Sequence, residues 1–290
     1  MAIKPNLLEG REMLMNDWLS EWGIRLIIGA GGSTLIAAGA YRLRSLSRSG
    51  MWSAIIMGTS YVVLGSPVWV GVLLAFFLSS PGWSKWKRHH RMKQKAESSY
   101  AKSGRRDAWQ VWANGGLGLI LCACHAIWPS EGWLYAFVGV MGAVNADTWA
   151  TEIGALSRTS TRAILSGKPV TPGTSGGVTL LGSLAALAGA VFIGLAAALL
   201  APQASASPST LIAAAAAAGF AGAFADSLLG ATGQAMYRCS LCGSEMERAE
   251  HCGAPAVQTR GFAWMTNDAV NMASSGIAGF LAWCIGLWLH

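Results

Sequence analysis

The sequence predicts an all-helical membrane protein, a polytopic bundle of about eight transmembrane helices. Of its 290 residues, 53% are hydrophobic and only 12% are charged, whereas a soluble domain carries about 25% charged residues. Apolar segments close to the length of a bilayer-spanning helix recur along the chain. They cover about 23–40, 51–64, 68–80, 108–128, 133–155, 175–200, 210–235 and 265–289, so residues 1–290 are predicted to form a single integral membrane domain.

Two of these segments are shorter than a full crossing. Segments 51–64 and 68–80 are predicted either as half-helices or as one span broken near Gly65, Ser66 and Pro67. The N-terminus begins M-A-I-K-P-N and carries acids before its first apolar segment, which is not the pattern of a signal peptide.

Basic residues alternate between successive connections and so predict the orientation of the spans. Lys and Arg are absent from the turns near 65–67, 129–132 and 201–209, and they occur in the loops 41–50, 85–106, 156–172 and 236–263. The positive-inside rule then puts both termini outside and the basic loops in the cytoplasm, in a protein integral to the cytoplasmic (plasma) membrane. Segment 85–106 holds nine of the 21 Lys and Arg residues, which reflects topology, attraction of anionic headgroups or phosphates, or both.

Three aspartates stand inside or at the mouth of apolar segments: Asp147, Asp226 and Asp268. A carboxylate in hydrocarbon costs about 2.5–3.5 kcal/mol on insertion scales, so it requires a partner or a water-filled cavity. A structural hydrogen bond between helices is the alternative to a functional site for each of them. Under the predicted topology they lie at the cytoplasmic face, so an active site facing the cytoplasm is expected.

Other polar residues are predicted to gather at the same face. They are Glu152 after Asp147, Asn267 and Asn271 beside Asp268, and the stripe of Asp107, Gln110 and Asn114 at the start of segment 108–128. Asp147 and Glu152 are five residues apart, about 140° around a helix. We therefore expect Asp147 to face the site while Glu152 holds a basic loop residue.

The residue types in this predicted cavity suit a metal ion and phosphate. Aspartate, asparagine and water oxygens favour Mg²⁺, held by one or two carboxylates together with substrate phosphates. Before segment 175–200 the chain reads P-G-T-S-G-G, with Lys168 just upstream. Glycine-rich backbone at a helix N-terminus favours phosphate binding, although a flexible turn into a membrane helix fits the same pattern. The residues expected to bind substrate or phosphate in the cavity are Lys168, Gly173, Thr174, Ser175, Gly176, Gly177, Arg106, Asn114, Glu152, Asn267 and Asn271.

The cysteines raise a separate question. Cys239 and Cys242 form a C-x₂-C pair, and His251 and Cys252 follow in the same predicted cytoplasmic loop. This spacing predicts either a structural zinc site or free thiols. Because His251 and Cys252 are adjacent, only one of them is expected to reach a metal comfortably. Cys122, Cys124 and Cys284 lie in spans and are predicted to serve packing.

Several of these strings occur together in a known family. They are R-R-D-A-W-Q-V-W-A-N-G at 105–115, A-D-T-W-A-T-E-I-G, G-K-P-V-T-P-G-T-S-G-G-V-T-L-L-G, A-D-S-L-L-G-A-T-G-Q and N-D-A-V-N. From about residue 50 to 290 the chain resembles the integral membrane family that contains transmembrane protein 19 and the chloroplast phytyl-phosphate kinase of tocopherol synthesis. It is also distantly similar to the CTP-dependent polyprenol kinases.

This resemblance implies a membrane lipid kinase. The enzyme would transfer a phosphate from a nucleoside triphosphate, with CTP favoured, to a prenyl monophosphate such as phytyl phosphate. Asp147, Asp226 and Asp268 would hold one or two Mg²⁺ ions, and the 173–177 loop would bind phosphates. Arginines would clamp the anions, drawn from Arg105, Arg106, Arg158 and Arg162. The bilayer would deliver the prenyl tail, and no nucleic-acid partner is expected.

An ion-coupled transporter of a charged or lipid-linked substrate is the main alternative, since intramembrane acids and glycine-interrupted helices also suit a carrier. Segments 146–154 and 225–233 share an A-D-[ST] pattern that fits a parallel repeat. A carrier's site, however, lies near the membrane midplane, whereas the polar residues here are predicted at one face. A purely structural membrane protein is the third alternative, and the acids argue against it.

Overall fold

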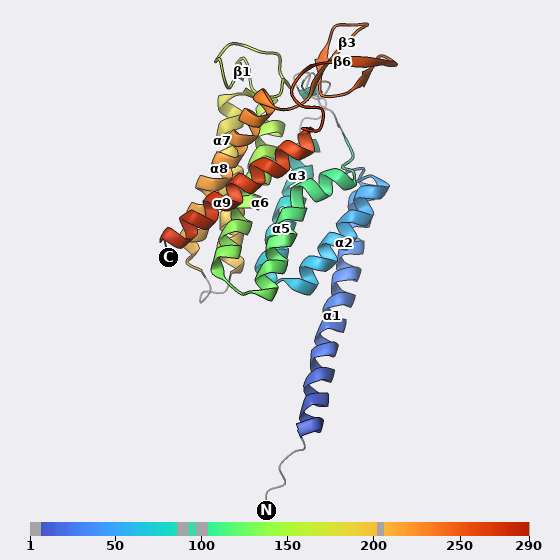
Figure 1. The fold of residues 1–290 in the computed structure, drawn as a ribbon, viewed down its shortest axis with the longest axis vertical. Coiled ribbons are helices and arrows are strands. Elements are labelled where there is room, and N and C mark those ends of the chain that lie inside the picture. Colours follow the sequence, from blue (N-terminus) through green and yellow to red (C-terminus); the bar gives the residue numbers. More distant parts are fainter. Residues whose placement is uncertain (1–6, 86–92, 95, 97–103, 202–205, 290) are drawn as a thin grey trace, which may run out of the picture.

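The computed structural model describes residues 7–85, 93–94, 96, 104–201 and 206–289. These residues form eight helices and six short strands (Figure 1). The helices are α1 (Leu7–Arg42), α2 (Arg48–Leu64), α3 (Pro67–Lys85), α5 (Ala108–Ile127), α6 (Glu131–Gly154), α7 (Leu180–Leu200), α8 (Pro208–Thr232) and α9 (Asn267–Leu289). The strands are β1 (Arg162–Ala163), β2 (Gly177–Val178), β3 (Met236–Cys239), β4 (Glu245–Met246), β5 (Glu250–His251) and β6 (Ala254–Arg260).

The predicted helical membrane bundle is confirmed. Five of the described helices are long and apolar enough to cross a membrane: α1 from Glu21, α5, α7, α8 and α9. Apolar side chains on their outer surfaces are widely exposed, with Leu35 at 77%, Leu199 at 84% and Phe280 at 62%. A surface of this kind is suited to lipid contact. Helices α2 and α3 are separate and meet at Gly65 and Ser66, where Pro67 opens α3, a position that tolerates proline.

Helix α6 is the centre of the bundle. It packs against α3, α5, α7, α8 and α9, and its residues from Leu134 to Ala146 are buried. Small residues allow this close packing: a Cβ added to Gly219 on α8 would collide with the backbone of Gly142 on α6. Close backbone approach through small residues is the usual way in which helices pack in a membrane.

One end of the bundle carries the six strands of the described residues (Figure 1). Strands β1 and β2 pair in one sheet, and the other sheet has the order β4-β3-β6-β5. The second sheet occupies the loop 236–263, for which the sequence indicated no strands. Arg260 at the end of β6 holds this sheet to α8, because its guanidinium donates to the carbonyls of Ala231 at 2.6 Å and Gly230 at 3.2 Å. A cation at a helix C-terminus also interacts favourably with the helix dipole.

The predicted basic segment 85–106 lies largely outside the described residues. Its described members include Lys93, Arg105 and Arg106, which line the same cavity as the 173–177 loop. The segment and the loop that begins at 156 therefore meet at one end of the bundle, as the alternation of basic and neutral connections predicts.

Candidate functional site

A cavity of about 1280 Å³ lies at the end of the bundle that carries the sheets. Its walls come from the ends of α5, α6, α7, α8 and α9 and from the connections between them. Most residues that the sequence singled out line this cavity: Arg106, Asn114, Asp147, Glu152, Gly173, Thr174, Ser175, Gly176, Gly177, Asp226, Asn267, Asp268 and Asn271. Segments far apart in the chain thus supply one polar chamber at the rim of an apolar bundle.

Two expected residues have other places in the fold. Lys168 is exposed in the turn between β1 and β2 and is not part of the cavity wall. Asp107 forms a capping box: its carboxylate accepts from the backbone N–H of Gln110 at 3.0 Å, and the Gln110 side chain accepts from the N–H of Asp107. This cap fixes the start of α5, so that Gln110 and Asn114 line the cavity while Asp107 does not.

Acidic side chains from three segments meet across the cavity. The carboxylates of Asp147 on α6 and Asp226 on α8 interact electrostatically with each other and with Glu247, just after β4. Ser274 on α9 donates to Asp226 Oδ2 at 3.0 Å and also to the carbonyl of Asn271. Glu247 was missed from the sequence, where it reads as one of several acids in a polar loop. Repulsion among these acids favours the binding of a cation between them.

Two buried polar atoms in the cavity wall have no hydrogen-bond partner among the described residues. They are the acceptor Oδ1 of Asn271 and the donor Nε2 of Gln234. The other end of the Gln234 amide accepts from the Ser175 hydroxyl at 2.7 Å, so this side chain is held in place. A buried polar atom without a hydrogen-bond partner lowers the stability of the fold, unless a ligand or a water molecule forms the missing hydrogen bond. Gln234 was not chosen from the sequence, although it ends the string A-D-S-L-L-G-A-T-G-Q.

Glu152 has the role that its helical position predicts. Its carboxylate forms an ion pair of 2.5 Å with Lys93 of the basic segment, and the two side chains are only 19% and 2% exposed. Lys93 also donates to the carbonyl of Trp83 at 2.8 Å. This ion pair links the basic segment to α6 and neutralises the charge of Glu152.

Arg106 is the buried cation of the cavity. It donates to the Ser80 hydroxyl at 2.7 Å, and its guanidinium lies 5.4 Å from the centre of the Phe76 ring. Burial lowers the pKa of this arginine, while the carboxylate of Glu152 acts in the opposite direction. A guanidinium held in this way remains charged and offers its other N–H groups to an anion.

The glycine-rich loop differs from the predicted arrangement. It does not form the first turn of a helix, because α7 begins only at Leu180, where the Thr179 side chain caps it. Instead the loop makes two turns with left-handed backbone, at Gly173 (φ 86°) and Gly176 (φ 79°). A Cβ at Gly176 would also collide with Ala231 at the end of α8. Glycine is therefore required there both for the conformation and for the contact.

A second cavity of about 70 Å³ adjoins the first. Most of its wall is apolar and comes from α1, α2 and α3, with Ile36, Met57 and Leu73 among the lining residues. Both cavities share Phe77, Arg106, Gln110 and Asn114. A small apolar cavity therefore adjoins the polar chamber at Arg106, Gln110 and Asn114.

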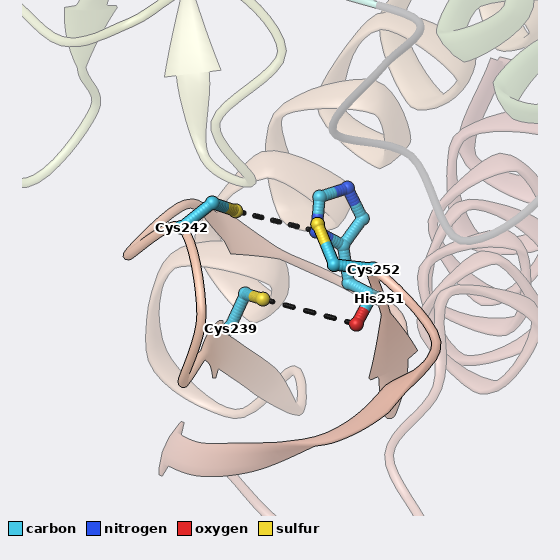
Figure 2. A group of neighbouring side chains, drawn as sticks. All are labelled: Cys239, Cys242, His251 and Cys252. Atoms are coloured by element: carbon cyan, nitrogen blue, oxygen red, sulfur yellow. Dashed lines mark hydrogen bonds between the residues drawn. The ribbon is translucent and has the colours of Figure 1, made fainter.

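The acids of the chamber do not form a ready-made metal cage. Among the described residues, the group of metal-ligating side chains whose ligand atoms converge is Cys239, Cys242, His251 and Cys252, not the aspartates (Figure 2). The donor set of the chamber, carboxylates plus the orphaned Asn271 oxygen, nonetheless fits Mg²⁺. This ion is usually held by one or two carboxylates and completed by water and substrate phosphates.

Comparison with known proteins gives the family. Residues 32–279 match the family described as "Integral membrane protein DUF92". The chain is 30% identical over 282 residues to "Protein PGR" of Arabidopsis thaliana. The aligned region covers 89% of this chain and 94% of that protein. It is also 30% identical over 208 residues to "Uncharacterized membrane protein MJ0933" of Methanocaldococcus jannaschii, covering 72% and 83% of the two chains. No solved structure matches. The chain therefore belongs to the DUF92 family of integral membrane proteins.

Proposed function

We propose that this protein is a membrane lipid kinase, which transfers a phosphate from a nucleoside triphosphate, with CTP favoured, to a prenyl monophosphate such as phytyl phosphate. The observation that carries the proposal is the junction of the two cavities. A small apolar cavity of about 70 Å³ meets the polar chamber at Arg106, Gln110 and Asn114, and it would enclose only the part of a lipid tail next to the phosphate. A lipid with an apolar tail and a charged phosphate has the same two-part character.

The proposed acceptor would place its tail along α1, α2 and α3 and its phosphate beside Arg106. The Arg106 guanidinium is fixed by Ser80 and Phe76, so little conformational entropy is lost when it binds an anion. Asn114 lies on the face of α5 that also carries Gln110, two turns after the capping box at the start of the helix. The buried donor Nε2 of Gln234 provides a further group for a phosphate oxygen.

The nucleotide phosphates would occupy the part of the chamber between the 173–177 loop and the acids. Backbone N–H groups in left-handed turns, as at Gly173 and Gly176, form concave anion-binding sites. Asp147 and Asp226 would hold Mg²⁺ with Asn271, and Asp268 lies in the first turn of α9 at the same cavity. The ion would neutralise phosphate charge during transfer.

The reaction requires no strong base. An oxygen of the acceptor monophosphate, already anionic, forms a bond to the γ-phosphorus of the donor. The bond between that phosphorus and the bridging oxygen breaks, and the nucleoside diphosphate leaves with the electron pair. Phosphoryl transfer depends chiefly on positioning and electrostatic stabilisation, which the buried Arg106 and the acids that line the chamber are suited to supply.

The decisive experiment uses the full chain purified in detergent with Mg²⁺, each of the four nucleoside triphosphates labelled at the γ-position, and a panel of prenyl alcohols and monophosphates. We expect labelled prenyl diphosphate from a monophosphate acceptor, with CTP the best donor. Formation of no labelled lipid with any donor would reject the kinase. If the same preparation instead moves a charged solute across liposomes, the protein is a transporter.

A further inference from the structure

The cysteine cluster is a second polar site, separate from the chamber in its chemistry. It consists of Cys239, Cys242, His251 and Cys252, and the four ligand atoms lie within 4.8 Å of one another (Figure 2). The imidazole Nδ1 of His251 is 3.4 Å from Cys242 Sγ and 3.2 Å from Cys252 Sγ. Cys239 Sγ lies 3.8 Å from the His251 carbonyl oxygen. Three sulfurs and one ring nitrogen therefore surround one point.

Two tight turns bring the four side chains together. In the first, the N–H of Gly243 donates to the carbonyl of Cys239 and Gly243 has a φ of 72°. In the second, Cys252 itself has a φ of 54° and Gly253 follows with 75°. A left-handed conformation at a non-glycine residue is costly. At Cys252 it lets two adjacent side chains turn to the same point, which the spacing in the sequence argued against.

The nitrogen–sulfur distances in the cluster are close to those of a tetrahedral metal site. With metal–sulfur bonds of about 2.3 Å and metal–nitrogen bonds near 2.0 Å, tetrahedral ligands lie about 3.5–3.8 Å apart. The observed separations between His251 Nδ1 and the two sulfurs are 3.2 and 3.4 Å. Four protein ligands leave no open position, which is the arrangement of a structural zinc site and not of a catalytic one.

The chemistry of the ligands agrees with this geometry. A thiolate, not a thiol, binds zinc. Three cysteine sulfurs and one histidine nitrogen form a Cys₃His set, which is one of the ligand sets of structural zinc sites. A disulfide would use only two of the three cysteines and would leave the histidine without a role.

We propose that Cys239, Cys242, His251 and Cys252 bind one structural Zn²⁺ ion, and that this ion holds the β3–β6 sheet against the chamber. Tyr237 of β3 lines the chamber, as do Glu247 and Ala249 in the connection from β4 to β5, and all three lie between or beside the proposed ligands in the chain. Metal binding would therefore fix one wall of the cavity and the position of Glu247. The proposal depends on the cluster alone and holds whichever substrate the chamber binds.

Metal analysis of the full chain tests the site. The protein is purified in detergent under reducing conditions through an affinity tag that does not use metal, and its zinc content is measured by mass spectrometry. We expect about one zinc per chain. Cys242→Ser and Cys252→Ser should each lower the zinc content at least tenfold. Cys252→His, which restores a fourth ligand, should retain it.

Cys284→Ser is the matched control, because Cys284 is also a free, exposed cysteine but lies on α9. It should leave the zinc content unchanged. For the wild type, cobalt substitution gives a readout that does not depend on how well variants fold: tetrahedral coordination with three thiolates produces strong visible absorption. A wild-type protein that holds no zinc and develops no cobalt–thiolate absorption would overturn the proposal. A Cys239–Cys242 disulfide in the native protein would overturn it as well.

Discussion

The polar chamber and the cysteine cluster lie at the same end of the molecule and are built in opposite ways. In the cluster, four ligand atoms already converge on one point. In the chamber, Asp147, Asp226 and Glu247 repel one another across a volume of about 1280 Å³. Amide groups of Asn271 and Gln234 have buried atoms without protein partners among the described residues. A single ion would complete the cluster, whereas the chamber has the volume and the charged lining for a larger ligand.

Under the two proposals above, the cluster serves stability and the chamber serves turnover. A closed set of ligands stabilises the fold only while its ion is bound. An open chamber with uncompensated groups costs stability and is retained where function requires it. Substitutions in the chamber should therefore alter activity more than folding. The exception is Glu152, whose charge is already neutralised by the ion pair with Lys93.

The largest effect on stability is expected from the neutralised acid. Glu152→Gln removes the carboxylate that pairs with Lys93 at 2.5 Å. Breaking a buried ion pair by removing one partner costs about 3–5 kcal/mol, because the remaining charge stays buried. We expect a large drop in the unfolding temperature in detergent. The double change Glu152→Gln with Lys93→Met should recover much of it, and a double variant as unstable as Glu152→Gln would show that the pair is not the cause.

The largest effect on activity is expected at the two central aspartates. Asp147→Asn or Asp226→Asn should lower phosphoryl transfer about 10²–10³-fold, the usual cost of losing one electrostatic contact to the transition state. In the Asp226→Asn variant, the amide oxygen could still accept the hydrogen bond that Ser274 donates to Asp226, so the unfolding temperature should hardly change.

The matched control is Glu131→Gln, an acid-to-amide change at the opposite end of α6. It should leave phosphoryl transfer near the wild-type rate. If the two aspartate variants also retain that rate, the chamber is not the site of transfer. If they unfold in detergent while Glu131→Gln does not, the aspartates serve the fold and the division between the two regions fails.

A smaller effect is expected in the 173–177 loop, which lines the chamber. Gly176→Ala places a Cβ where the φ is 79° and where it would collide with Ala231. The left-handed conformation alone costs an alanine about 1–2 kcal/mol. Gly167→Ala provides the control, since its φ is 65° and no atom lies within 4 Å of the added Cβ. Gly176→Ala should lower the unfolding temperature further than Gly167→Ala, and equal losses would rule out the steric contact.

The smallest effect is expected at the surface of the β3–β6 sheet. Glu245 and Arg238 form an ion pair of 2.5 Å, but their side chains are 53% and 58% exposed. Exposed pairs of this kind are screened and contribute little. Glu245→Gln should leave both the unfolding temperature and the zinc content unchanged. A loss of zinc in this variant would mean that the surface pair, and not the cluster, organises the sheet.

The sequence predicted the bundle and the gathering of polar residues well, because both follow from strong local signals. Uninterrupted apolar segments mark the helices, and an acid in such a segment is conspicuous. The ion pair of Glu152 followed from its angle to Asp147 on one helix. These inferences require only the period of a helix and the charge of the loops.

The parts that the sequence did not predict depend on contacts between distant segments. Strand β6 pairs with β3, which lies 15 or more residues before it, and its apolar and polar residues do not alternate in a clear pattern. Glu247 enters the chamber only because this sheet folds back over it. Asp107 looked like a cavity residue by its spacing, but a capping box competes for the same side chain. Lys168 was predicted to bind phosphate because it is close in sequence to the glycine-rich loop, but it is exposed and does not line the cavity.

The enclosed position of α6 also bears on how the protein enters the membrane. Although α6 is the central helix, it is not among the helices that are apolar enough to cross on their own, and it carries Asn145, Asp147 and Glu152. The helices that cover these residues, α7, α8 and α9, are synthesised after it. We therefore expect α6 to remain at the insertion machinery until α7, α8 and α9 are synthesised, and to enter the bilayer together with them. The polar residues that α6 contributes to the chamber would thus delay the assembly of the bundle.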